Sequence, residues 1–146
     1  MASRKSVPRQ PTPRPEKKSR CIPGTSRSAD EHIAWRFELI SREPCYGWDT
    51  LTADDHKLLN EHLAQFESMT IGQLFNNSGR PCKTYTNPHD IPDGLARKRF
   101  LEQYDDQDEI HRLRCGGIKR IYGFRQGNIF MILWWDPRHE IWPSSR

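Results

Sequence analysis

The chain has 146 residues and a net charge of +4, with a mean hydropathy of −0.91 and 34% hydrophobic residues. This length suits one modest domain, and the low apolar content indicates that part of the chain lies outside any core. No run approaches the roughly 20 apolar residues of a bilayer-spanning helix, and residues 1–30 lack the apolar segment of a secretory signal. The sequence therefore predicts a cytoplasmic protein with no membrane partner.

Charge is unevenly distributed along the chain. Residues 1–30 carry eight basic and two acidic side chains, residues 31–110 carry eight and fifteen, and residues 111–146 carry seven and two. Two basic ends therefore flank an acidic middle. RNA is a natural partner for the basic ends, because neutralising phosphates releases counterions. For the first basic segment, simple solvation is an equal alternative.

The first half of the chain predicts a tail, a strand and a helix. Residues 1–30 contain five prolines among Ser, Lys and Arg, which is typical of a disordered segment. In residues 32–40 apolar and polar side chains alternate, which predicts a half-buried strand. Thr52 and Asp55 then form a capping-box pattern at the start of a helix that we expect to end near Met69.

The middle of the chain predicts a turn, a loop and a second helix. Thr70 and Gln73 repeat the capping-box pattern before a short turn that ends at Phe75. Residues 76–94 are rich in Gly, Pro, Asn and Asp and predict a long loop, and residues 95–104 predict a helix. A plain connector is the simpler interpretation of the loop, although four of its side chains can reach a phosphate or a base: Arg80, Lys83, Tyr85 and His89.

The last part of the chain predicts an antiparallel meander of four strands, at residues 110–115, 118–125, 128–135 and 139–142. Glycines and an Asp-Pro step between these runs supply the turns. In the first two runs arginines alternate with apolar residues, so one face of the sheet is expected to carry guanidinium groups. The third run is apolar on both faces, which predicts a central strand.

Four cysteines are scattered along the chain without a Cys-x-x-Cys pair, so the sequence indicates neither a zinc site nor a disulfide framework. Reduced thiols are the simpler interpretation, although a metal site built from Cys45, Cys82, His89 and Cys115 is an alternative. We therefore expect no metal and no cofactor.

With this element order, the arginine-rich meander resembles the RelE/HigB/YoeB-like superfamily of bacterial toxins. The resemblance is carried by the RLR run at Arg112–Arg114, a following glycine, Arg120, Tyr122, a hydrophobic strand and the RHEIW run at residues 138–142. It covers roughly the last 35 residues by motif. It implies an α+β, RelE-like domain over residues 31–146, in which one strand and two helices precede the four-stranded antiparallel meander, behind the disordered tail.

The resemblance also implies a function. Members of this superfamily are the toxin components of toxin–antitoxin systems and cleave mRNA without a metal, either free or on the ribosome. The 2′-hydroxyl of the message attacks the neighbouring phosphate. This chemistry requires a base, positive charge on the pentavalent phosphorane, and an acid for the departing oxygen. The expected partners are mRNA and a cognate antitoxin protein.

The resemblance assigns catalytic roles to Arg120, Arg138 and His139. Arg120 is the first candidate for the phosphate clamp, since a planar guanidinium binds two phosphate oxygens at once, and Arg138 is the second. His139, with a reference pKa of about 6.5, can act as acid or base. The expected RNA-binding residues are Arg112, Arg114, Lys119, Tyr122 and Trp142.

Trp142 stands where the superfamily often has a catalytic tyrosine. An indole cannot donate a proton from oxygen, so the acid role would pass to His139 or Tyr122. This departure favours an alternative function, a non-catalytic RNA- or protein-binding accessory protein of a phage or mobile element on the same scaffold. Structural alternatives also exist: the arginines can be solvated residues on an open sheet, and His139 can hydrogen-bond Asp136 across a turn.

Overall fold

The computed structural model describes residues 29–75 and 81–143. The tail predicted over residues 1–30 therefore lies almost entirely outside the described residues. The described strands are β1 (Ala34–Arg36), β2 (Cys82–Tyr85), β3 (Ile110–Arg114), β4 (Arg120–Gln126) and β5 (Ile129–Asp136). The described helices are α2 (Ala53–Glu67), α3 (Ile71–Phe75) and α4 (Gly94–Gln103), with the short 3-10 helices η3 (Trp48–Thr50) and η4 (Pro88–Asp90).

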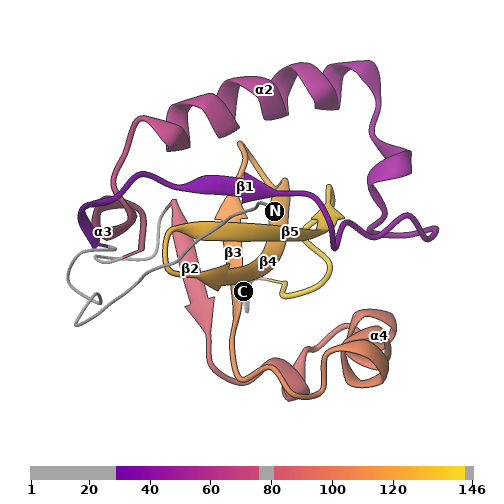
Figure 1. Cartoon of the computed structure of the whole chain (residues 1–146). Helices are drawn as coiled ribbons and strands as arrows, with labels where there is room; N and C mark the ends of the chain where they lie inside the picture. Colours follow the sequence, from indigo (N-terminus) through magenta and orange to yellow (C-terminus); the bar gives the residue numbers. More distant parts are fainter. Residues whose placement is uncertain (1–28, 76–80, 144–146) are drawn as a thin grey trace, which may run out of the picture.

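The five described strands form one mixed sheet in the order β1-β5-β4-β3-β2 (Figure 1). Strand β1 pairs in parallel with β5, and the other neighbouring pairs are antiparallel. The fold is therefore α+β, as predicted. Strand β5 is an interior strand covered on both faces, but the middle position belongs to β4.

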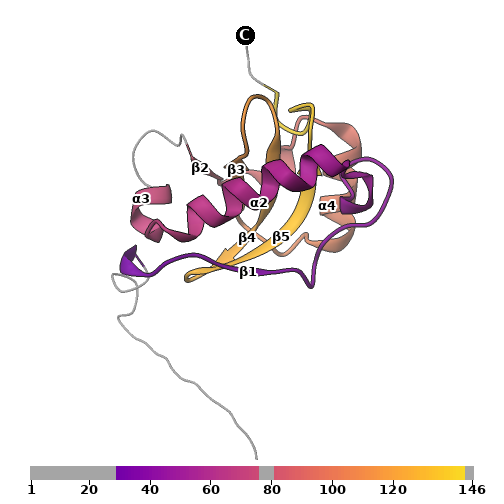
Figure 2. The same cartoon turned by 90° about the horizontal axis from the view of Figure 1, so that it is seen from above.

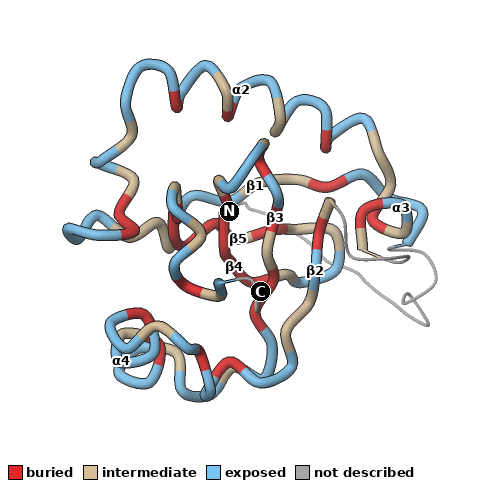
Figure 3. The backbone as a smooth tube through the Cα atoms, turned by 180° about the vertical axis from the view of Figure 1, so that it is seen from behind, coloured by how far each residue is buried: buried red, intermediate tan, exposed pale blue. Residues whose placement is uncertain are grey.

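Helices cover the two faces of the sheet. Helices α2 and α3 lie on one face and α4 lies on the other (Figures 1 and 2). Each face has its own apolar cluster, and the buried segments of α2 and of the strands point toward one another (Figure 3). The first cluster includes Leu59, Phe66, Ile71, Leu74, Leu113, Ile121, Ile132 and Trp135, and the second includes Ala96, Phe100, Ile110, Tyr122, Phe124, Leu133 and Trp134.

Both capping boxes are confirmed. The Thr52 hydroxyl accepts a hydrogen bond from the Asp55 backbone N–H, and the Asp55 carboxylate accepts one from the Thr52 N–H, each at 3.1 Å. Thr70 and Gln73 make the same reciprocal pair at 2.9 and 3.1 Å. These side chains satisfy backbone donors that have no partner inside the helix, so both helices begin where the sequence predicts.

The fourth run of the predicted meander is not a strand. Residues 139–142 instead continue a turn after β5, because the Asp136 carboxylate accepts hydrogen bonds from the backbone N–H groups of Glu140 and Ile141, both at 2.9 Å. His139 adopts a φ of +58°, in the left-handed region. The Asp136 side chain thus binds the backbone N–H groups that would otherwise pair with a neighbouring strand. The meander therefore has three strands, not four.

The long loop predicted over residues 76–94 contains a strand. Strand β2 pairs antiparallel with β3, so that Cys82 faces Leu113 and Lys83 faces Arg112. Only Cys82 within β2 is fully buried. An edge strand with one buried side chain has no alternating apolar pattern, which is why its composition predicted a loop. The first strand is also shorter than the predicted 32–40, because the chain turns at Phe37, whose carbonyl accepts from Ile40 N.

Candidate nucleic-acid interface

The sheet face that carries α4 also carries a basic and aromatic surface beside that helix. Its register is fixed by strand pairing: Arg112 faces Lys83 on one side and Tyr122 on the other, and Arg114 faces Arg120. Residues two apart along a strand point to the same face, so these side chains gather together. We call this surface the arginine face and define it as Lys83, Tyr85, Arg112, Arg114, Arg120, Tyr122, His139 and Trp142.

Arg120 is the first residue of β4, faces Arg114, and is only 4% exposed. Its Nη1 donates to the carbonyl oxygens of Gly117 at 2.7 Å and Lys119 at 3.0 Å, which points the guanidinium toward the turn between β3 and β4. Its buried Nε has no hydrogen-bond partner within residues 29–75 and 81–143. Within the described part of the chain, no carboxylate forms an ion pair with Arg120.

Burial lowers the pKa of Arg120, and the positive charges of Arg112 and Arg114 lower it further. A guanidinium stays protonated at neutral pH in spite of such shifts, so the buried charge of Arg120 lies beside the half-buried Arg112 and the exposed Arg114. Burying a charge without a counterion is costly. An anion with several oxygen acceptors would offset that cost, and a phosphodiester is such an anion.

His139 lies close enough to this cluster to respond to its charge. Burial lowers the pKa of His139, and the charges of Arg120 and Arg112 also lower it, whereas the Asp136 carboxylate raises it. The imidazole is therefore neutral at pH 7 and able to accept a proton. The Asp136 carboxylate holds the turn through Glu140 and Ile141, and in this way it fixes the backbone of His139 beside the arginines.

Three aromatic rings line the arginine face. Tyr85 and Trp142 stack in parallel, with ring centroids 3.8 Å apart and planes 4° apart, and Tyr85 also lies 6.4 Å from Tyr122 at 28°. The Tyr122 side chain is fully buried, and its hydroxyl has no hydrogen-bond partner among the residues that the structure describes. Burial raises the pKa of Tyr122 far above its ordinary value, so the phenol stays protonated and its buried hydroxyl remains a hydrogen-bond donor.

The structure does not bring all the residues of the sequence-based site together. Arg112, Arg114, Arg120, Tyr122, His139 and Trp142 lie on the arginine face. Lys119 points to the opposite face, where its Nζ pairs with the Asp55 carboxylate of α2 at 2.7 Å. Arg138 is exposed on the turn after β5. Among the described residues, no hydrogen bond or ion pair links the Arg138 side chain to the residues around Arg120.

Sequence analysis missed that Lys83 and Tyr85 belong to the same surface as the arginines. Both were noted as side chains able to reach RNA, but from a loop. The available signal was their spacing, since Lys83 and Tyr85 alternate with the buried Cys82 and with Thr84, as in a strand. Four residues are too few for that alternation to stand out against the surrounding Pro, Asn and Asp.

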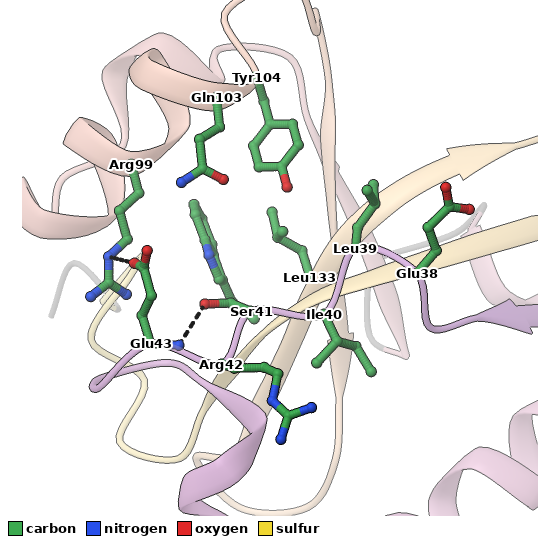
Figure 4. A pocket seen from close by; sticks show the side chains of 11 residues that line it. Glu38, Leu39, Ile40, Ser41, Arg42, Glu43, Arg99, Gln103, Tyr104 and Leu133 are labelled. Carbon is green, nitrogen blue, oxygen red and sulfur yellow. Dashed lines mark hydrogen bonds and ion pairs between the residues drawn. The ribbon is translucent and has the colours of Figure 1, made fainter.

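Two pockets lie away from the arginine face. One, of about 260 Å³, lies between α4 and residues 38–43, with Gln103 and Tyr104 pointing toward it (Figure 4). Its one α4 arginine, Arg99, is neutralised by Glu43 at 2.8 Å and also donates to two backbone carbonyls. The other, of about 360 Å³, is bordered by Asp106, Asp108 and Glu109 together with His111 and Arg125. The ion pair leaves Arg99 unsuited to bind a phosphate in the first pocket, and in the second Glu109 acts electrostatically on Arg125 while the neighbouring carboxylates would repel a phosphate.

The described residues contain no cluster of three or more His, Cys, Asp or Glu side chains that would suit a metal ion. Across those same residues, no helix combines the length and apolar character needed to cross a bilayer. No protein-family model, curated sequence or solved structure matches the chain.

Proposed function

We propose that the chain is the RelE-like toxin of a toxin–antitoxin system and that it cleaves mRNA on the arginine face without a metal. One observation carries the proposal: Arg120 is buried with two neighbouring arginines and no ion-pair partner among the described residues, next to an unpartnered Tyr122 hydroxyl. A phosphodiester supplies the missing negative charge and the missing acceptor together.

In the proposed reaction, His139 accepts the proton of an RNA 2′-hydroxyl, because its lowered pKa keeps the imidazole neutral at pH 7. The 2′-oxygen then attacks the adjacent phosphorus, and Arg120 and Arg112 stabilise the negative charge that builds on the phosphorane oxygens. The P–O bond to the 5′-oxygen breaks. The products are a 2′,3′-cyclic phosphate and a 5′-hydroxyl.

Tyr122 is the proposed proton donor to the departing 5′-oxygen. His139 is poorly suited to that step, since the neighbouring arginines disfavour its protonated form. The Tyr122 hydroxyl keeps its proton at neutral pH and lies two residues from Arg120 on the same face of β4. It takes the role that Trp142 cannot fill. A neighbouring antitoxin would neutralise the chain by covering the arginine face with an acidic or apolar segment.

The test is cleavage of a labelled RNA by the purified chain, with the product ends identified. Arg120→Met should lower the cleavage rate by about a hundredfold or more, as loss of a transition-state donor does. The thermal midpoint should be equal or higher, because an apolar side chain of similar length replaces a poorly solvated charge. RNA with 2′-deoxy sugars should resist cleavage.

Arg36→Met is the matched control, since Arg36 is exposed on β1 at the other edge of the sheet from β2. It should cleave like the unaltered chain. Full cleavage by Arg120→Met, or cleavage of the deoxy substrate, would exclude the mechanism. If the unaltered chain binds RNA and leaves it intact, the non-catalytic binding module is the correct function.

A further inference from the structure

We propose that β2 extends the arginine face into a subsite for single-stranded RNA, where a nucleobase stacks on the Tyr85–Trp142 pair and Lys83 binds the adjoining phosphate. The identity of the ligand as RNA rests on the proposed function. Lys83 and Tyr85 lie on a strand that the sequence resemblance does not include, whereas Trp142 lies in the 138–142 run that it does include. The subsite flanks the reacting phosphate.

The aromatic pair has the geometry of a stacking surface. Buried aromatic pairs often meet edge to face, whereas Tyr85 and Trp142 lie nearly parallel at 3.8 Å. Both side chains are only half-buried. A nucleobase can therefore continue the stack on the half-exposed indole, and such stacking accepts any base because every base has a π face.

Positive charge lies beside the stack. The Lys83 Nζ is 4.9 Å from the centroid of the Tyr85 ring, so the ammonium group and the aromatic pair can contact the phosphate and the base of one nucleotide. Lys83 is exposed and faces Arg112 across the β2–β3 pair. Positively charged side chains therefore follow one another from Lys83 at the sheet edge through Arg112 toward Arg120.

The same register sets the distance between the stacked base and the reacting phosphate. Neighbouring strands lie about 4.8 Å apart, so Lys83 on β2 and Tyr122 on β4 are separated by about 10 Å across the sheet. That spacing places the stacked base one or two nucleotides from the phosphate at Arg120. In a duplex the bases are paired and stacked inside the helix, so only a single strand can place a base on Trp142.

The experiment measures fluorescence anisotropy with a labelled 2′-O-methyl RNA of about ten nucleotides, which cannot be cleaved, and with an abasic strand of equal length. The unaltered chain should bind the normal strand about tenfold more tightly than the abasic strand, because stacking contributes only when bases are present. Duplex RNA should bind as weakly as the abasic strand. Equal affinity for the normal and abasic strands would overturn the inference.

Variants locate the effect. Tyr85→Leu should weaken binding of the normal strand about tenfold and leave the abasic strand unchanged, whereas Lys83→Gln should weaken both by a smaller factor. Tyr104→Leu, at a half-buried tyrosine that ends α4, is the control and should bind normally. Retained base-dependent binding in Tyr85→Leu would contradict the subsite. If Tyr85→Leu does not fold, the comparison of normal and abasic strands with the unaltered chain and with Lys83→Gln still decides whether the subsite exists.

A parallel cleavage assay with ordinary RNA separates this inference from the proposed function. Cleavage without base-dependent binding would remove the subsite and leave the nuclease. Base-dependent binding that Tyr85→Leu abolishes, without any cleavage, would support the subsite and exclude the nuclease. Binding to none of the strands would exclude the subsite.

Discussion

Arg120 and Lys119 are neighbours in sequence with opposite environments. Lys119 has a carboxylate partner in Asp55 on the α2 side of the sheet, whereas Arg120 is buried on the other side with carbonyl acceptors only. Lys119 immediately precedes β4 and Arg120 is its first residue, so the alternation of side chains sends them to opposite faces, and among the described residues only Lys119 of the two has an ion-pair partner. Position within the strand, more than charge, therefore distinguishes a structural cation from a candidate binding group.

His111 should make the fold sensitive to acid. It is 3% exposed, and burial, with a further contribution from Arg125, lowers its pKa to about 4. Around it lie the Thr84 hydroxyl at 2.9 Å, the Glu109 carboxylate at 3.8 Å and the Phe75 ring. The unfolded chain binds the proton near pH 6.5 and the folded chain only near pH 4, so stability falls as pH drops through this window.

The shift corresponds to about 3 kcal/mol between these two pH values. His111→Asn can keep the hydrogen bond to Thr84 but cannot titrate. Its free energy of unfolding, measured by urea denaturation from about pH 7 to about pH 4.5, should therefore fall less steeply than that of the unaltered chain. Parallel curves would show that a group other than His111 controls the acid sensitivity.

The β4–β5 hairpin positions the site through an irregularity. Tyr122 pairs with Trp134 and Gly123 pairs with Ile132, so Leu133 is an extra residue in β5. Such a bulge turns Leu133 and Trp134 toward the same face, where both pack in the cluster beneath α4. The bulge thereby fills the core next to Tyr122 and holds Tyr122 in the arginine face.

Gly123 is required for that bulge. A Cβ at this position would collide with the Met131 carbonyl oxygen and lie 2.7 Å from the Phe130 ring. Gly123→Ala should destabilise the fold by about 3 kcal/mol or prevent folding, because backbone cannot move aside as a flexible side chain can. Thermal denaturation measures the change. Gly94→Ala, at the start of α4 with open space around it, is the control and should be neutral or slightly stabilising.

Elements that depend on local chemistry could be predicted from the sequence. The two capping boxes fix α2 and α3, and the Gly127 turn with a φ of +61° joins β4 to β5. Strand β2 and the turn at residues 139–142 could not be predicted, because they depend on pairing with β3 and on the Asp136 side chain, which are tertiary contacts. The same distinction applies to the arginine face. Alternation predicted Arg112 and Arg120, but only the sheet brings Lys83 and Tyr85 beside them.

At the scale of the whole molecule, acidic and basic regions are separated in space as well as in sequence. Asp106, Asp108 and Glu109 border a pocket with His111 and Arg125, away from the arginine face. An RNA strand would therefore meet positive charge on one surface and repulsion near another, which orients it. The basic tail adds charge outside the described residues, so net charge alone does not identify the binding surface.

The salt dependence of RNA binding identifies that surface. Each phosphate neutralised on a single strand contributes about −0.7 to the slope of log affinity against log salt, so four basic residues of the arginine face predict a slope of about −3. Arg112→Gln with Arg114→Gln should reduce the magnitude by about 1.4, measured by anisotropy from about 50 to about 200 mM salt. Arg36→Gln with Lys98→Gln removes the same charge from exposed positions elsewhere. An equal loss of slope in both double variants would mean that net charge drives binding, whereas a loss confined to the first pair would place the phosphates on the arginine face.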